Sequence, residues 1–231
     1  YREAKKLLTQ AFGENSSRVG QMEWLLGSMY LNKHDLNAAL HHSLLALSIL
    51  TNSLHAHHPD VTNLYRHLGS VYRQRNRPDS AMACFARALE GSSKNPTAIE
   101  EAGRADVFTN MGQLFAQAGS FDSALIYLRT SLDIQHGQRN QDPLILSKTH
   151  RALGDLLTGN TLHREALLSY QRALQALSQN PGDSSWRPLE STATAGYGRE
   201  RLNILWAIGR TYRALAGRGS NGGPFLSKAL S

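Results

Sequence analysis

Cationic and amide side chains recur at matched places along this 231-residue chain, and they are the residues best suited to binding chemistry. Arg66, Lys148 and Arg151 can pair with carboxylates through charge-assisted hydrogen bonds. Asn110 can bond to an extended peptide, whose backbone offers a donor and an acceptor at almost every residue. These residue types predict a site for an acidic or extended peptide. The alternative interpretation is that they are solvated charges on a helix face.

Motifs for catalysis and for cofactor binding are not evident in the sequence. It contains no nucleophile elbow, no His-Glu-x-x-His and no paired acid/base motif. His55, His57 and His58 cluster without a matching carboxylate or cysteine, and the glycine-rich stretch 216–223 lacks the Gly-Lys-Ser/Thr ending of a phosphate loop. We therefore expect no enzyme activity, no cofactor and no metal.

Composition fits an ordinary soluble protein, with 41% hydrophobic and 19% charged residues and no apolar run approaching the ~20 residues needed to cross a membrane. The net charge of +7 favours acidic partners without selecting one. The single Cys84 excludes an internal disulfide and fits a reducing compartment. We expect a cytoplasmic protein, with a cytoskeletal or ciliary association as a narrower alternative. Because the chain begins at Tyr1 in mid-pattern, we also expect that a natural N-terminal part is missing.

Paired amphipathic helices are the elements that must position these residues. The best-formed pair runs from Pro59 to Leu89, and in its second helix Ala81, Phe85 and Ala88 share one face. Arg77-Pro78-Asp79 predicts the turn between the two helices. The pattern recurs around glycines that are 42, 43, 42 and 55 residues apart, namely Gly27, Gly69, Gly112, Gly154 and Gly209.

Such repeats predict an all-α fold, a right-handed superhelical solenoid of antiparallel helical hairpins that forms one domain over residues 1–231. We expect 1–12 to be the second helix of a truncated repeat and 180–196 to be an extended loop. A degenerate last repeat, with only 224–231 left for its second helix, occupies 197–231. The full repeats are predicted at 20–55, 60–92, 98–137 and 143–179.

The hairpin pattern resembles the tetratricopeptide repeat (TPR), which has a period of ~34 residues. The longer spacing, together with His58-Pro59-Asp60-Val61 before a first helix, resembles the long repeats of kinesin light chains. Thr62 stands where alanine is usual in that family. Similar long repeats occur in clustered-mitochondria proteins, nephrocystin-type ciliary proteins and bacterial signalling proteins, so the resemblance is to a class of repeat.

The TPR resemblance implies that the first helix of each hairpin lines a concave groove that binds peptides or partner proteins. The candidate groove residues are Trp24, Asn63, Arg66, Ser70, Arg73, Asn110, Gln113, Lys148, Arg151, Trp206 and Arg210. Chaperone-binding TPR domains clamp a terminal carboxylate with lysine, arginine and asparagine. The matching places here hold Arg66, Ser70, Asn110, Lys148 and Ala152, and Ser70 and Ala152 depart from that pattern. For Trp24 and Trp206, packing against a neighbouring helix is the alternative to a binding role.

Three functions remain open from the sequence. The first is a non-catalytic scaffold or adaptor that binds a peptide or protein in the groove, including a cargo or cytoskeletal adaptor. The second is a basic helical repeat that binds nucleic acid, which the charge and the run Arg73, Arg75 and Arg77 favour, although no recognition motif accompanies them. The third is the sensor or adaptor portion of a larger enzyme or signalling protein.

Overall fold

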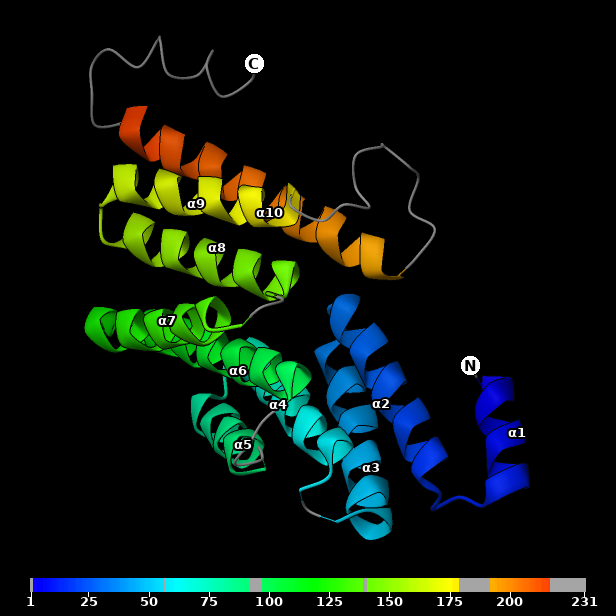
Figure 1. Cartoon of the computed structure of the whole chain (residues 1–231). Helices are drawn as coiled ribbons and strands as arrows, with labels where there is room; N and C mark the ends of the chain where they lie inside the picture. The colour runs from blue at the N-terminus through cyan, green and yellow to red at the C-terminus, as the bar shows by residue number, and fades with distance from the viewer. Residues whose placement is uncertain (1, 56, 92–96, 139–140, 179–191, 217–231) are drawn as a thin grey trace. The chain divides into compact units, whose positions relative to one another are not determined.

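The computed structural model describes residues 2–55, 57–91, 97–138, 141–178 and 192–216, and this part of the chain contains α-helices and no strand (Figure 1). The chain divides into two compact units, Tyr1–Leu114 and Phe115–Ser231, and the division falls within α6. The helices are α1 (Arg2–Phe12), α2 (Ser17–Asn32), α3 (Leu36–Ser53), α4 (Pro59–Gln74), α5 (Pro78–Glu90), α6 (Ala98–Gln117), α7 (Phe121–His136), α8 (Pro143–Gly159), α9 (His163–Ser178) and α10 (Thr192–Ala216).

In the first unit, α2 pairs with α3 and α4 pairs with α5 as antiparallel hairpins, drawn from blue to teal in Figure 1. The helix starts follow from local sequence. The side chain of Asp35 caps α3 by accepting a hydrogen bond from the amide of Ala38 at 3.0 Å. The turns inside the two hairpins use His34 and Asn76 at φ 61° and 57°, in the left-handed region that asparagine tolerates well.

Glycine permits the closest approach within the α4/α5 hairpin. A Cβ atom added at Gly69 would lie 2.5 Å from Cδ1 and 2.8 Å from Cζ of the fully buried Phe85. Ala81 is fully buried one helical turn before Phe85. Leu50, Leu64 and other apolar residues of α3 and α4 complete a core between successive hairpins. Each hairpin thus buries its apolar face against the next, as expected for a solenoid.

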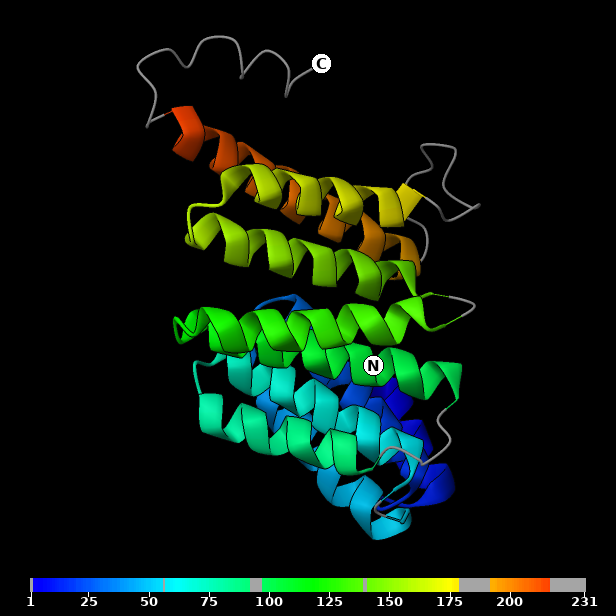
Figure 2. The same cartoon turned by 60° about the vertical axis from the view of Figure 1, so that its left-hand side comes forward.

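The second unit contains the end of α6 followed by α7, the α8/α9 hairpin and α10. The hairpin repeats the close approach seen in the first unit, because a Cβ atom at Gly154 would lie 2.5 Å from Cε1 of the buried Tyr170. Helix α10 lies against both α8 and α9 (Figure 2), and its Ile204 and Ala207 join the core formed by α9. The predicted all-α fold of antiparallel helical hairpins is confirmed.

Helix α10 begins at Thr192, so residues 192–196, which we expected to belong to an extended loop, are helical. Their Thr and Gly residues disfavour a helix, but their two alanines favour one, and the following Tyr197 packs against the core of α9 and α10. The remainder of the predicted loop and the predicted second helix at 224–231 lie outside the described residues.

The histidine cluster before α4 has a structural role. His58 caps the helix, since its Nδ1 accepts a hydrogen bond from the amide of Asp60 at 3.2 Å. In the described part of the chain no group of three or more His, Cys, Asp or Glu residues is arranged to hold a metal ion. Nor does any helix there have the length and apolar character that crossing a membrane would require.

Candidate functional site

Polar side chains on α4 and α6 meet within the first unit. Arg66 donates from Nη1 to Oδ2 of Asp106 at 2.6 Å. The carboxamide oxygen of Asn110 accepts from Ser70 Oγ at 3.4 Å and from Arg73 Nε at 3.3 Å. Four predicted groove residues, Arg66, Ser70, Arg73 and Asn110, therefore lie together where two successive first helices face each other. We call this surface the first-helix face of the unit.

Arg66 is less free to bind a partner's carboxylate than the sequence suggested. Its side chain is 30% exposed, and that of Asp106 is 10% exposed, so the pair is partly shielded from water. The Asp106 carboxylate already balances the arginine charge. The Nε of Arg66 is buried without a hydrogen-bond partner among the described residues.

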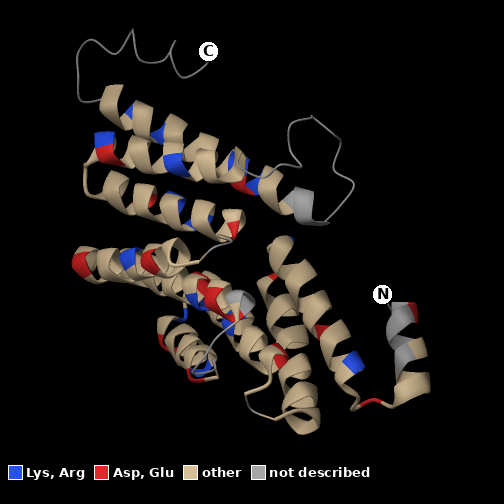
Figure 3. Cartoon of the chain, in the orientation of Figure 1, with Lys and Arg blue, Asp and Glu red and all other residues tan. Residues whose placement is uncertain are grey.

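The second unit contains a similar network. Arg151 donates from Nε to Glu200 at 2.6 Å and from Nη1 to Asp155 at 3.1 Å. Asp155 also accepts hydrogen bonds from Arg210 at 3.0 Å and from the Tyr170 hydroxyl at 2.9 Å. Burial alone would lower the pKa of Arg151, but the carboxylates of Glu200 and Asp155 outweigh burial and raise it. Acidic and basic residues accordingly occur together on α8, α9 and α10 in Figure 3.

The two units share an ion pair between an arginine on one first helix and an acidic residue on the next. Arg66 and Arg151 each lie three residues before the first-helix glycine, and each donates to an acidic residue on the next first helix. The main contacts of these two arginines therefore join repeats. Both arginines were candidates from the sequence, but Glu200 was not, and the pairing of Arg66 with Asp106 was not predicted. Opposite charges on consecutive first helices are the signal that would have indicated the pairing.

The two tryptophans among the candidate groove residues, Trp24 and Trp206, differ in exposure. Trp24 is half-buried and packs against the core of α3 and α4, which supports the packing interpretation for this residue. Trp206 on α10 is 62% exposed, and the guanidinium of Arg210 lies 4.9 Å from the centre of its ring. Of Trp24 and Trp206, it is therefore Trp206 that is accessible as a large aromatic anchor.

The remaining predicted residues are distributed between the units. Asn63 on α4, Gln113 on α6 and Lys148 on α8 are half-buried. Of the five places matched to a carboxylate clamp, Arg66, Ser70 and Asn110 lie together in the first unit. Ala152 is only 4% exposed and belongs to a core cluster of the second unit, so it does not line a groove there.

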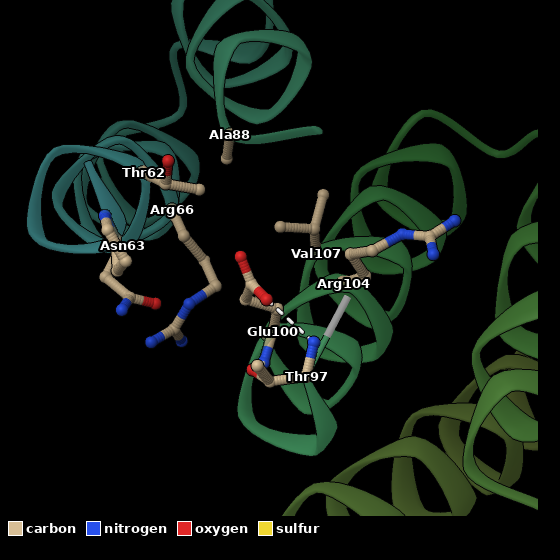
Figure 4. Close-up of a pocket in the computed structure, with 10 residues that line it drawn as sticks. Thr62, Asn63, Arg66, Ala88, Thr97, Glu100, Arg104 and Val107 are labelled. Carbon is tan, nitrogen blue, oxygen red and sulfur yellow. Dashed lines mark hydrogen bonds between the residues drawn. The ribbon is translucent and has the colours of Figure 1, made fainter. Parts of the chain in front are cut away.

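A pocket of about 300 Å³ opens beside Asn63 and Arg66 in the first unit (Figure 4). Its walls come from the first turns of α4, the end of α5 and the first half of α6. Apolar surface is provided by Pro59, Ala88 and Val107. Sequence analysis did not predict this pocket, because it forms where three helices meet.

Charged groups at the pocket are largely paired within the protein. Arg104 donates to Glu101 at 3.2 Å, and Glu100 accepts from the backbone amide of Thr97 at 2.7 Å, the bond drawn in Figure 4. The neighbouring His67 is neutral near pH 7, because burial, with a smaller contribution from Arg66, lowers its pKa to about 4. The pocket thus combines an apolar interior with hydrogen-bonding groups, and its Glu100 carboxylate bonds to a backbone amide.

The paired helices with close glycine contacts define a helical-repeat protein whose first helices carry buried and half-buried polar residues. Residues 18–94 match the family model of the tetratricopeptide repeat. Over this segment the chain is therefore similar to tetratricopeptide repeats.

Solved structures have the same fold. BtubC (BKLC) from P. vanneervenii is 20% identical, with a TM-score of 0.59 over 95% of this chain and 89% of that chain. Nearly identical TPR-like repeats assigned to a kinesin light chain of Podosopora anserina are 16% identical, with a TM-score of 0.59 over 93% of this chain and 94% of that chain. At these identities the similarity shows the fold alone. No curated protein matches the chain.

Proposed function

We propose that this protein is a non-catalytic interaction scaffold that binds an extended peptide segment on the first-helix face of its first unit. The tetratricopeptide fold supports a role in protein interaction in general. The observation that carries the more specific proposal is the pocket between α4, α5 and α6, which opens beside predicted groove residues Asn63 and Arg66.

The size and lining of the pocket suit a single apolar side chain. Its volume of about 300 Å³ is at the lower end of the range for small-ligand sites, which is ~300–1,000 Å³. Pro59, Ala88 and Val107 would surround the side chain. A buried apolar anchor is the usual centre of binding energy at a protein interface.

Hydrogen bonding rather than free charge would orient the peptide. The partly exposed guanidinium of Arg66 can donate to a peptide carbonyl or carboxylate, and Asn63 can both donate and accept. Because Asp106 balances the charge of Arg66, we expect the preference for acidic peptides to be weaker than the net charge of +7 implies.

Filling the pocket tests the proposal. A Cβ atom at Gly103 would lie 3.8 Å from Asn63 Oδ1 and 4.0 Å from Arg66 Nε, which is ordinary contact. Gly103→Leu therefore places a side chain in the pocket, and leucine is favoured over glycine in a helix by roughly 0.8 kcal/mol. The variant should fold normally.

The experiment selects binders from a random peptide library displayed on phage and measures their affinity by calorimetry. We expect the selected peptides to share an apolar residue and to lose about 2 kcal/mol of binding free energy, roughly 30-fold in Kd, to Gly103→Leu. Gly159→Leu is the matched control, since Gly159 lies in the second unit with nothing within 4 Å of its added Cβ. Unchanged binding to Gly103→Leu, or failure to select any peptide, would contradict the proposal.

Nucleic-acid binding has less support as an alternative. Two of the three arginines that motivated it are engaged within the protein, since Arg73 bonds to Asn110 and Arg75 bonds to the carbonyl of Leu36 at 3.4 Å. A role as cargo or cytoskeletal adaptor is a narrower form of the scaffold proposal, and the loop His58-Pro59-Asp60-Val61 is what supports it. The half-buried free thiol of Cys84, whose pKa burial raises to about 11, is compatible with the proposed cytoplasmic location.

A further inference from the structure

Helix α10 has apolar residues on two opposite sides, and the core of the second unit uses one of them. Ile204 and Ala207 are buried in the core that α10 shares with α9. On the other side of the helix three large apolar side chains are exposed, Leu202 by 68%, Leu205 by 49% and Trp206 by 62%. We call these three residues the outer stripe. Because a surface helix ordinarily has one apolar stripe, which faces the core, packing of the unit does not account for the outer stripe.

Arginines accompany the outer stripe on the exposed side of α10. All four arginines of this helix are exposed. Its one acidic residue, Glu200, is only 4% exposed and bonds to Arg151. In helical projection Arg201 borders the outer stripe on one side, and Arg213 continues it two turns after Trp206. The exposed side of α10 thus combines large apolar side chains with positive charge.

Arg210 borders the outer stripe on its other side, and it has partners within the protein. It donates to Asp155 at 3.0 Å, and its guanidinium lies 4.9 Å from the centre of the Trp206 ring. The Asp155 carboxylate therefore balances part of its charge. Binding of an external anion would depend more on Arg201 and Arg213.

An acidic helix of a partner protein and an anionic membrane surface are both complementary to such a face. Peptide helices typically dock in a groove. In the described part of the second unit α8 and α9 alone contact α10, and the buried side of α10 packs on them, so the outer stripe belongs to a single helix (Figure 1). A bilayer interface accepts a single helix that presents tryptophan and leucine beside arginines. These features favour the membrane surface.

We propose that α10 binds an anionic membrane surface, lying in the plane of the interface with its outer stripe toward the acyl chains. Trp206 would then lie at the level of the headgroups, where the amphipathic indole ring is favoured. Arg201 and Arg213 would contact the phosphate and carboxylate groups of anionic lipids. The helix would lie on the membrane without crossing it. This surface lies in the second unit and does not depend on the peptide pocket of the first.

Flotation of the full chain with lipid vesicles tests the proposal. Vesicles of phosphatidylcholine with about 30% phosphatidylserine are compared with vesicles of phosphatidylcholine alone. We expect binding to the anionic vesicles at low salt and binding about tenfold weaker to the neutral ones. Trp206→Ser should weaken binding to the anionic vesicles about tenfold, because it removes the largest apolar side chain of the outer stripe. Leu168→Ser is the matched control, since Leu168 on α9 is 56% exposed, and it should leave binding unchanged.

Paired charge reversals separate the charge of α10 from the net charge of the chain. Arg201→Glu combined with Arg213→Glu should weaken binding to the anionic vesicles at least about tenfold. Arg129→Glu combined with Arg164→Glu changes the net charge equally, at exposed positions of α7 and α9, and should retain most of the binding. Circular dichroism of each variant should show the helical content of the parent chain.

Absence of flotation with the anionic vesicles would overturn the proposal, and the outer stripe would then be assigned to an acidic helix of a partner protein or to another contact of this chain. Equal losses in the two double variants would also overturn it, since binding would then reflect net charge alone. So would binding that Trp206→Ser leaves unchanged.

Discussion

The close contact between Gly69 and Phe85 allows the packing of α4 against α5 to be tested by a substitution at Gly69. In Gly69→Ala the new methyl group would lie 2.5 Å from Cδ1 and 2.8 Å from Cζ of the Phe85 ring. The ring is fully buried, so it cannot move aside without displacing its neighbours. Overpacking of this kind costs about 1–3 kcal/mol.

The same substitution has an opposing effect, since alanine is favoured over glycine within a helix by about 0.8–1 kcal/mol. Gly103→Ala isolates that effect in the same unit, because its Cβ atom would have only ordinary contacts, at 3.8 and 4.0 Å. The difference in stability between the two variants therefore measures the overpacking alone. We expect Gly69→Ala to be less stable than Gly103→Ala by about 1–3 kcal/mol.

Urea unfolding followed by circular dichroism at a helical wavelength provides the free energies of unfolding. The comparison requires that the free energy of unfolding falls with urea concentration at the same slope in both variants, which would show that both expose similar surface on unfolding. If Gly69→Ala were as stable as Gly103→Ala, the close approach of α4 and α5 would not be present as described, and the register of the hairpins would be wrong.

Three further outcomes follow from burial and charge. Ala81→Leu should lower the free energy of unfolding by about 1–3 kcal/mol, because Ala81 is fully buried, and unchanged thermal stability would refute the register. Glu200→Gln should lower the free energy of unfolding in urea by about 3 kcal/mol, because it leaves the largely buried Arg151 with Asp155 as its one carboxylate partner. A negligible loss would show that the ion pair between Arg151 and Glu200 does not join α8 to α10. His67 has a folded pKa of about 4, below its unfolded value of 6.5, so its contribution to stability is complete above pH 6.5 and declines as pH falls toward 4. His67→Gln should therefore reduce the loss of stability between pH 7 and pH 4.5. If the variant and the parent chain lost stability equally over this range, the lowered pKa of His67 would be contradicted.

Much of the fold was predictable from the sequence because the hairpin is a local structure. The pairing of Gly69 with Phe85, and of Gly154 with Tyr170, follows from small and large residues recurring at fixed spacing. The cap that Asp35 provides to α3 is likewise a local feature, since it bonds to the amide three residues on. The start of α10 was missed, since the Thr and Gly residues before Tyr197 indicated a loop, whereas Tyr197 packs against the core of α9 and α10.

The candidate site was only partly predictable. The sequence indicated that Arg66 and Asn110 lie on first helices, and the structure places them on facing helices. It did not reveal that Asp106 balances Arg66, because the contact depends on the distance between two repeats. The pocket beside Val107 was missed for a similar reason, as its walls come from three helices. Periodicity identifies the face of a helix, whereas the charge and shape of a site depend on what the next helix presents.

The central proposal is that an apolar peptide side chain enters the pocket between α4 and α6. The most direct measurement is a nuclear Overhauser effect between the methyl groups of Val107 and that side chain, in a complex with a selected peptide. The account predicts a cross-peak for Val107 and none for the exposed Leu168 of the second unit. A bound peptide that shows no contact with Val107 would contradict it.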